Sequence, residues 1–165
     1  MPEVIKNNSD VLFVNHEMIE EIKYEALQSS RHMARLLMHL SHEDVVQEML
    51  IAMGRGCVVT PNSAAGKSES LQVIEGRLLL VIFDLEGNVV KEEEMAPVGN
   101  NCASIYRLNF TPWHTMIPLT EMVVVHETLQ GPFENSSEPM PSWIPSDNSS
   151  MKKFIQKILV NSKLA

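Results

Sequence analysis

The residues best suited to do chemistry lie in a stretch bounded by Gly56 and Gly76. This stretch contains Asn62 and Ala64, which are two positions apart, and then Glu69. Side chains two positions apart on a strand point to the same face, so Asn62 and Ala64 are expected to share one face of a strand. A carboxylate such as Glu69 can move protons or bind a metal ion. This stretch is therefore our first candidate for a functional site.

Other polar patterns give weaker indications. The serines of this stretch have no arrangement of partners that would make one of them a nucleophile. Residues 65–68 lack the first glycine of a phosphate-binding loop at the required spacing, which argues against a nucleotide site. His32, His39 and His42 are close in sequence, but isolated histidine spacings of this kind are typical of surface or packing residues.

The spacing of the glycine-bounded stretch resembles the first motif of the cupin proteins. That motif reads Gly, five residues, His-x-His, three or four residues, Glu, six residues, Gly. Here Gly56, Glu69 and Gly76 match it, while Asn62 and Ala64 stand where the two histidines would be. The second cupin motif ends in a histidine, and the stretch from residue 111 to His114 looks like that end.

Further segments narrow the resemblance to the WbuC-type cupin-fold proteins, which are often encoded among O-antigen genes. The matching segments are residues 46–52, 75–78, 113–114, 131–133 and 141–145. The resemblance covers residues 15 to 145, and His39 matches a family histidine near the mouth of the barrel. It implies a cupin-type antiparallel β-barrel, or jelly roll, in a family of metalloproteins whose activity is unsettled.

The resemblance also implies a metal site of three histidines and a glutamate, a set suited to Zn, Fe, Mn, Ni or Cu. In this chain Glu69 and His114 are good ligands, Asn62 offers only an amide oxygen, and Ala64 offers no donor. We therefore expect a degenerate site that holds one divalent transition metal weakly at most, unless His39 fills the gap. The expected pocket residues are Asn62, Glu69, Trp113, His114 and His39.

Three functions follow as alternatives, and the sequence leaves open whether the protein is an enzyme. The first is a binding protein for a small polar ligand, such as a sugar or sugar derivative, with a reduced or lost metal site. The second is a metal-dependent isomerase, epimerase or oxygenase of O-antigen or polysaccharide biosynthesis, in which Glu69 or His114 moves protons. The third is a dimeric scaffold, and since cupins commonly dimerise we expect a homodimer in each case.

The elements that must position these residues can be read from the pattern of apolar residues. Asn15 can cap a helix whose apolar stripe runs through Met18, Ile19, Ile22, Ala26 and Leu27. From Asp44 to Leu129 short apolar runs alternate with turns such as Glu75-Gly76, which predicts antiparallel strands forming a barrel or sandwich. Residues 1–43 would pack on the barrel, which spans residues 44–130.

Residues 131–165 are expected to form a Pro- and Ser-rich tail and then a helix from Met151 to Leu164. The tail carries apolar residues that suggest packing across the barrel, namely Phe133, Met140, Trp143 and Ile144. The helix has an apolar face and several lysines on the other side, and we expect it to dock on its own domain or on a second subunit.

Composition limits the remaining possibilities. A chain of 165 residues suits one domain, and its net charge of -8 argues against nucleic-acid binding. No apolar run is long enough to span a membrane. Cys57 and Cys102 are expected to be buried thiols. The first eight residues lack the basic start and apolar core of a signal peptide, so we expect a cytoplasmic protein.

Overall fold

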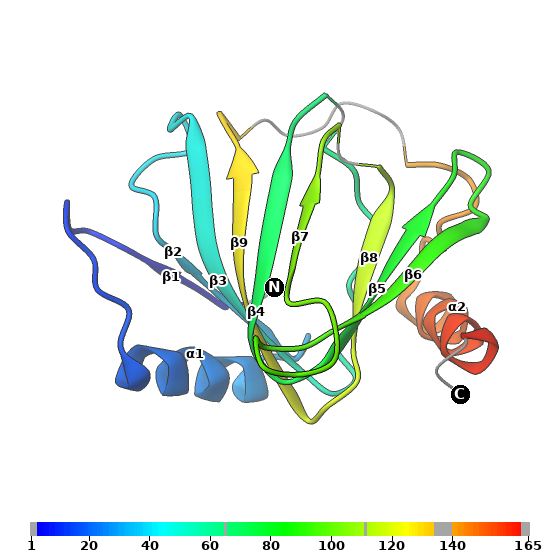
Figure 1. The fold of residues 1–165 in the computed structure, drawn as a ribbon, viewed down its shortest axis with the longest axis horizontal. Helices are drawn as coiled ribbons and strands as arrows, with labels where there is room; N and C mark the ends of the chain where they lie inside the picture. Colours follow the sequence, from blue (N-terminus) through cyan, green and yellow to red (C-terminus); the bar gives the residue numbers. More distant parts are fainter. Residues whose placement is uncertain (1–2, 65, 111, 134–139, 163–165) are drawn as a thin grey trace.

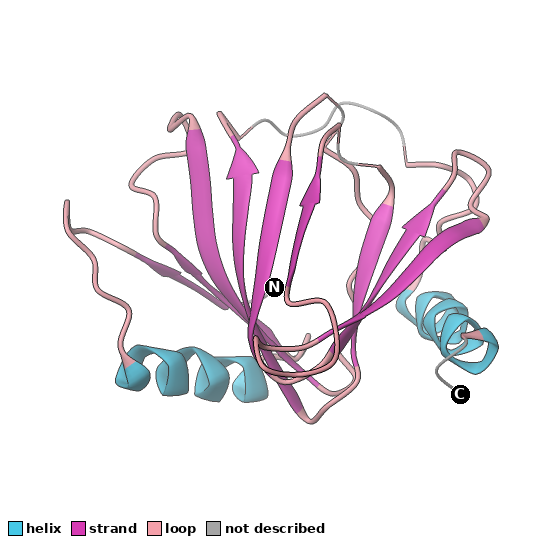
Figure 2. Cartoon of the chain, viewed as in Figure 1, coloured by secondary structure: helices cyan, strands magenta, loops and turns pink. Residues whose placement is uncertain are grey.

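The computed structural model describes residues 3–64, 66–110, 112–133 and 140–162, which contain nine strands and two helices. The strands are β1 (Glu3–Lys6), β2 (Met33–Leu37), β3 (Val46–Gly54), β4 (Glu69–Glu75), β5 (Leu78–Phe83), β6 (Val89–Met95), β7 (Ile105–Leu108), β8 (His114–Pro118) and β9 (Met122–Gln130). The helices are α1 (His16–Gln28) and α2 (Asn148–Asn161). The predicted mainly β fold with an N-terminal and a C-terminal helix is confirmed (Figure 2).

The strands form two sheets that face each other across a shared core (Figure 1). The larger sheet has six strands in the order β1-β2-β3-β9-β4-β7, and the smaller has three in the order β6-β5-β8. β1 pairs with β2 in parallel, and the other paired strands are antiparallel. β1 and β2, which precede residue 44, therefore extend the same sheet as β3, β9, β4 and β7.

The alternation of side chains along each strand separates an inner core from two outer ones. On β3, Ile51 and Met53 point into the core between the sheets, whereas Leu50 and Ala52 point to the outer face. The inner core is made of buried apolar residues from both sheets. Its members are Met33, Ile51, Met53, Cys57, Val59, Leu71, Val73, Leu78, Leu80, Met95, Met116, Val123 and Val125.

Helix α1 covers the outer face of the large sheet (Figure 1). It begins after Asn15, whose side-chain oxygen accepts a hydrogen bond of 3.0 Å from the backbone N–H of Met18, as the sequence predicts. Ile22 and Ala26 are completely buried against the outward-pointing residues of β2, β3 and β9. Helix α1 therefore shields the outer face of the large sheet from solvent.

Helix α2 covers the outer face of the small sheet. It begins three residues before the predicted start, because Asp147 provides the N-cap by accepting a 2.9 Å hydrogen bond from the N–H of Ser150. Its buried residues Ile155 and Ile158 pack against alternate residues of β5. Strand β5 is apolar throughout because one set of its side chains faces α2 and the other set faces the inner core.

The segment before α2 packs across the barrel only in part. Trp143 donates a 3.1 Å hydrogen bond to the carbonyl oxygen of Leu85, and Ile144 is buried. Phe133 and Met140, which were expected to pack in the same way, are 49% and 56% exposed. Neither helix among the described residues is long and apolar enough to cross a membrane.

Candidate functional site

Glu69 and His114 meet on the inner side of the barrel. Each is the first residue of its strand, Glu69 in β4 and His114 in β8. Leu71 and Val73 follow Glu69 at two-residue intervals and belong to the inner core, so Glu69 points the same way. The two side chains are only 3% and 1% exposed, and His114 Nε2 lies 3.2 Å from Glu69 Oε1. The two sheets thus contribute one partner each to a buried carboxylate–imidazole pair.

The remaining polar atoms of this pair have partners of their own. His114 Nδ1 lies 2.9 Å from the carbonyl oxygen of Pro112, which can only accept, so Nδ1 carries the proton and donates it. The hydroxyl of Tyr106, on β7, donates a hydrogen bond to Glu69 Oε1. The orientation of the imidazole is therefore fixed: Nδ1 donates to Pro112 and Nε2 faces Glu69, which also accepts a hydrogen bond from Tyr106.

These contacts shift the pKa values of His114 and Tyr106. Burial by itself lowers the pKa of His114, but the hydrogen bond and charge of Glu69, with the carbonyl of Pro112, raise it overall. Burial, followed by the negative charge of Glu69, raises the pKa of the Tyr106 hydroxyl. Tyr106 therefore stays protonated and remains a hydrogen-bond donor at neutral pH, and the raised pKa of His114 stabilises its imidazolium form relative to that of an ordinary histidine.

Glu127 and Arg35 extend this polar group across the large sheet. Glu127 follows Val123 and Val125 of the inner core on β9, and Arg35 follows Met33 of the same core on β2. Burial, with the negative charge of Glu69, raises the pKa of Glu127 to about 7, while Arg35 and His114 oppose this rise. The Nε atom of Arg35 is buried without a hydrogen-bond partner among the described residues. We call Arg35, Glu69, Tyr106, His114 and Glu127 the inner polar cluster.

Asn62 lies beside His114 through its backbone. The two residues exchange N–H···O bonds of 3.0 Å in both directions, in an isolated antiparallel bridge. The Asn62 side chain is exposed, in contrast to the buried imidazole of His114. Asn62 is therefore a backbone neighbour of His114, but its own side chain is exposed.

Trp113 and His39 do not join the inner polar cluster. Trp113 packs with the residues between the small sheet and α2, and its ring centroid lies 6.0 Å from that of Trp143. It precedes His114 and so points to the opposite face of β8. His39 Nδ1 lies 2.9 Å from the carbonyl oxygen and 3.1 Å from the backbone nitrogen of Glu48, which fixes it at the start of β3.

The glycines of the motif make the turns that lead to these strands. Gly76 has φ +79°, a conformation that L side chains rarely adopt. A Cβ at this position would overlap the carbonyl oxygen of Met122. The turn between β4 and β5 therefore depends on glycine, and with it the link between the two sheets.

The fit of a transition metal to this site can be judged from the donors present. His114 Nε2 and Glu69 Oε1 are close enough to bind one ion together, and the bond from His114 Nδ1 to a carbonyl is usual for a metal-binding histidine. Protein zinc sites, however, use three or four protein ligands. Among the described residues no group of three or more His, Cys, Asp or Glu side chains could hold a metal ion. The described donors therefore do not fit a complete transition-metal site.

Sequence reasoning missed three members of the inner polar cluster. Arg35, Tyr106 and Glu127 belong to no motif that was recognised. A signal for Glu127 was present, because it continues the inward-facing positions of Val123 and Val125 with a charged residue. Arg35 stands in the same relation to Met33, but this is only visible once the strand and its inner face are known.

The chain is similar to one family model and to several solved structures. No curated protein matches the sequence. A family model described as a domain of unknown function, DUF6016, matches residues 14–95.

Three similar solved structures are a cupin domain of Cnp3 from Schizosaccharomyces pombe, a cupin domain of an XRE family transcriptional regulator from Enterobacter cloacae, and KdgF from Halomonas sp.. The first has 9% identity and a TM-score of 0.49, covering 61% of this chain and 66% of that one. The second has 20% identity and a TM-score of 0.46, covering 61% and 98%. The third has 16% identity and a TM-score of 0.47, covering 62% and 81%. This chain thus spans just under two thirds of the length of the first.

Proposed function

We propose that this protein binds a small, neutral, polyhydroxylated molecule at the inner polar cluster, without a resident metal ion. The observation that carries the proposal is the buried Glu69–His114 pair, held at 3.2 Å and completed by Tyr106 and Pro112. Buried ionisable groups are costly and rare unless they are paired, and they are frequent at functional sites. A barrel needing only stability would be served as well by apolar residues at these positions.

The access and charge of the cluster support a neutral ligand. Arg35, Tyr106 and Glu127 are half-buried rather than fully buried although they lie on the inner face, so part of each residue remains in contact with solvent. The raised pKa of His114 favours an imidazolium that would offset the charge of Glu69, and Glu127, with a pKa of about 7, is partly protonated at neutral pH. A layer with so little net charge and many donors and acceptors suits hydroxyl groups better than an ionic group. Saccharide-related molecules are the first class to test.

The test combines metal analysis with ligand titration on the untagged protein. Metal content is measured after growth with Fe, Mn, Zn, Ni and Cu, and a panel of hexoses, deoxyhexoses and polyols is then titrated by protein NMR. We expect less than one metal ion per ten chains, and at least one ligand that shifts resonances near Glu69 and His114. Tyr106→Phe should weaken that ligand about tenfold, because one buried hydrogen-bonding hydroxyl is lost. The matched control is Tyr24→Phe, at an exposed tyrosine on α1.

Two results would overturn the proposal. One is stoichiometric metal in the natural protein that is lost in His114→Ala. The other is a ligand panel that binds nowhere near the cluster, or equally well to Tyr106→Phe.

One observation favours a metal-dependent enzyme as the second candidate. His114 Nδ1 is already bound to a carbonyl, which leaves Nε2 and Glu69 Oε1, 3.2 Å apart, as two donors close enough to share one ion. The double variant Asn62→His/Ala64→His separates the two candidates. If it binds one ion per chain and the natural protein binds none, the natural site has lost its metal, whereas equal metal binding by both moves the enzyme to first place.

A further inference from the structure

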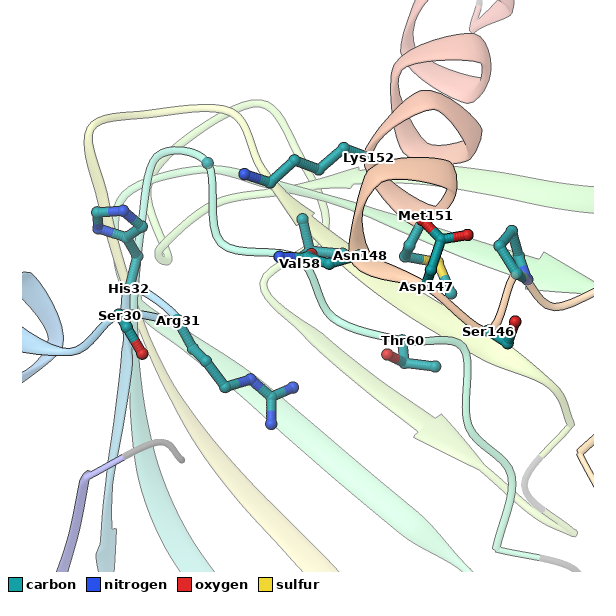
Figure 3. A pocket seen from close by; sticks show the side chains of 12 residues that line it. Ser30, Arg31, His32, Val58, Thr60, Ser146, Asp147, Asn148, Met151 and Lys152 are labelled. Atoms are coloured by element: carbon teal, nitrogen blue, oxygen red, sulfur yellow. The ribbon is translucent and has the colours of Figure 1, made fainter.

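A polar cavity is lined by residues other than those of the inner polar cluster. It has a volume of about 330 Å³ and lies where the start of α2 approaches the segments before β2 and after β3 (Figure 3). Residues from all three segments line it, including Arg31, His32, Thr60, Asp147 and Lys152. No member of the inner polar cluster is among the lining residues. The volume is at the lower end of the range for small-molecule sites, about 300–1,000 Å³.

Two cations on opposite sides of this cavity are not neutralised. In Figure 3, Lys152 extends from α2 toward the side that carries His32, and Arg31 extends toward Thr60. Neither Arg31 nor Lys152 forms an ion pair with a described residue, whereas Lys23, Arg55 and Arg77 do. Two cations without an ion-pair partner among the described residues therefore line one cavity, where both can attract an anion.

Asp147 is the one carboxylate in the lining, and its role is already assigned. It accepts the N–H of Ser150 at 2.9 Å as the N-cap of α2, and this hydrogen bonding lowers its pKa. The end of the helix is therefore satisfied by the protein itself, and an anion would be held by Arg31 and Lys152 instead. Asp147 disfavours a second negative group nearby but can accept a hydrogen bond from a ligand hydroxyl.

We propose that this cavity is a binding site for a small phosphorylated molecule with a hydroxylated body, separate from the ligand of the inner polar cluster. Arginine holds phosphate oxygens through two parallel N–H groups, and lysine adds a point charge from the other side. The hydroxyls of Ser30, Thr60 and Ser146, with the Asp147 carboxylate, line the rest of the cavity and suit hydroxyl groups of the ligand. Because Arg31 precedes β2 and Lys152 belongs to α2, a phosphate bound by both links the helix to the large sheet.

The experiment titrates the full chain with inorganic phosphate, with a hexose phosphate and with the parent hexose, using backbone-amide NMR and Trp fluorescence. Both tryptophans, Trp113 and Trp143, pack beside α2 and report on its docking. We expect saturable binding of the hexose phosphate with shifts around Arg31 and Lys152, and weaker binding of inorganic phosphate at the same place. The parent hexose should not shift these residues.

Variants distinguish a built site from general attraction of anions. Arg31→Ala and Lys152→Ala should each weaken the hexose phosphate about tenfold or more, as expected for loss of a charge-assisted contact. Lys153→Ala, at the next position of the same helix and exposed outside the cavity, is the matched control and should change affinity less than twofold. The proposal is overturned if Lys153→Ala weakens binding as much as Lys152→Ala, or if no saturation is seen at about 10 mM hexose phosphate. Neither result bears on Tyr106→Phe, so the two sites are tested independently.

Discussion

Replacing Glu69 with glutamine should reveal how much the buried pair contributes to the free energy of unfolding. The change keeps the shape of the side chain and removes only its charge and its strongest hydrogen-bond acceptor. At 3.2 Å, two opposite charges attract by about 5 kcal/mol when the effective dielectric constant is 20. Part of this is offset by the cost of burying the charges, so we expect Glu69→Gln to destabilise the protein by about 3 kcal/mol.

The loss of stability in Glu69→Gln should depend on pH. The pKa of His114 is raised in the folded protein, so the group contributes stability that is fully present below about pH 6.5 and is lost as pH rises through the folded pKa. Without the Glu69 charge, the largest remaining effect on His114 is burial, which lowers its pKa. The variant should therefore lose most of this stabilisation at acidic pH, and its His114 should titrate at lower pH than in the natural protein.

The assay is urea unfolding followed by Trp fluorescence at several pH values between about 5 and 8, with an NMR titration of His114 in parallel. The matched control is Glu48→Gln, because Glu48 pairs with His126 at 3.5 Å where the two side chains are 41% and 28% exposed. A pair open to solvent should contribute less than about 1 kcal/mol. Our reasoning is refuted if both variants lose the same small amount, or if the pKa of His114 is unchanged in Glu69→Gln.

Three further changes test other parts of the structure. The free energy of unfolding of Glu127→Gln should rise by about 2 kcal/mol relative to that of the natural protein as pH rises from 5 to 8. The reason is that a carboxyl whose pKa is raised to about 7 destabilises the folded protein once it is ionised. A difference in urea unfolding that stays constant across that pH range would contradict this prediction. Tyr106→Phe should cost about 1–2 kcal/mol in the same assay by removing a donor from Glu69, and no loss would mean that the bond is not formed in solution. Gly76→Ala should cost more than about 2 kcal/mol and lower the thermal midpoint, since its Cβ would overlap the Met122 carbonyl; a neutral outcome would show that the turn can rearrange.

Local patterns were sufficient to predict most of the elements. The cap at Asn15 and the stripe after it define α1, and the glycine turn at Gly76 separates β4 from β5. The start of α2 was placed at Met151, because the apolar stripe begins there, but the cap at Asp147 adds a polar first turn. Polar turns of this kind carry no apolar signal, so a prediction based on periodicity places such a start late.

Strand β6 shows the same limit in a different way. The apolar pattern marks only Val89 and Val90 of this strand, but β6 continues to Met95 through one lysine and three glutamates. Lys91 to Met95 pair with the apolar residues Ile82 to Leu78 of β5, which supply the burial that β6 lacks. Whether an edge strand such as β6 forms depends on the neighbouring strand, and the sequence of the edge strand alone does not reveal that neighbour.

Glu69 and His114 could be predicted because a sequence motif contains them. Glu127 could not, because only the register between β4 and β9 brings it to the site. Glu69 and His114 lie 45 positions apart in sequence, and the bond between them needs both sheets to be in place. Glu127 reaches the same place because β9 pairs with β4, which puts Glu127 opposite Leu71, next to Glu69 along the inner face. A one-residue shift of that register would turn Glu127 to the outer face and leave Glu69 with His114 and Tyr106.

The raised pKa of Glu127 is thus a property of the β4–β9 pairing rather than of any local sequence. Its causes are burial by the sheet and the charge of Glu69 on the neighbouring strand, with Arg35 from β2 acting against them. The three charged residues come from three strands of one sheet, and His114 alone comes from the other. A ligand that contacts His114 together with Glu127 would therefore bridge the two sheets, so its binding should raise the thermal midpoint of the natural protein more than that of Glu127→Gln.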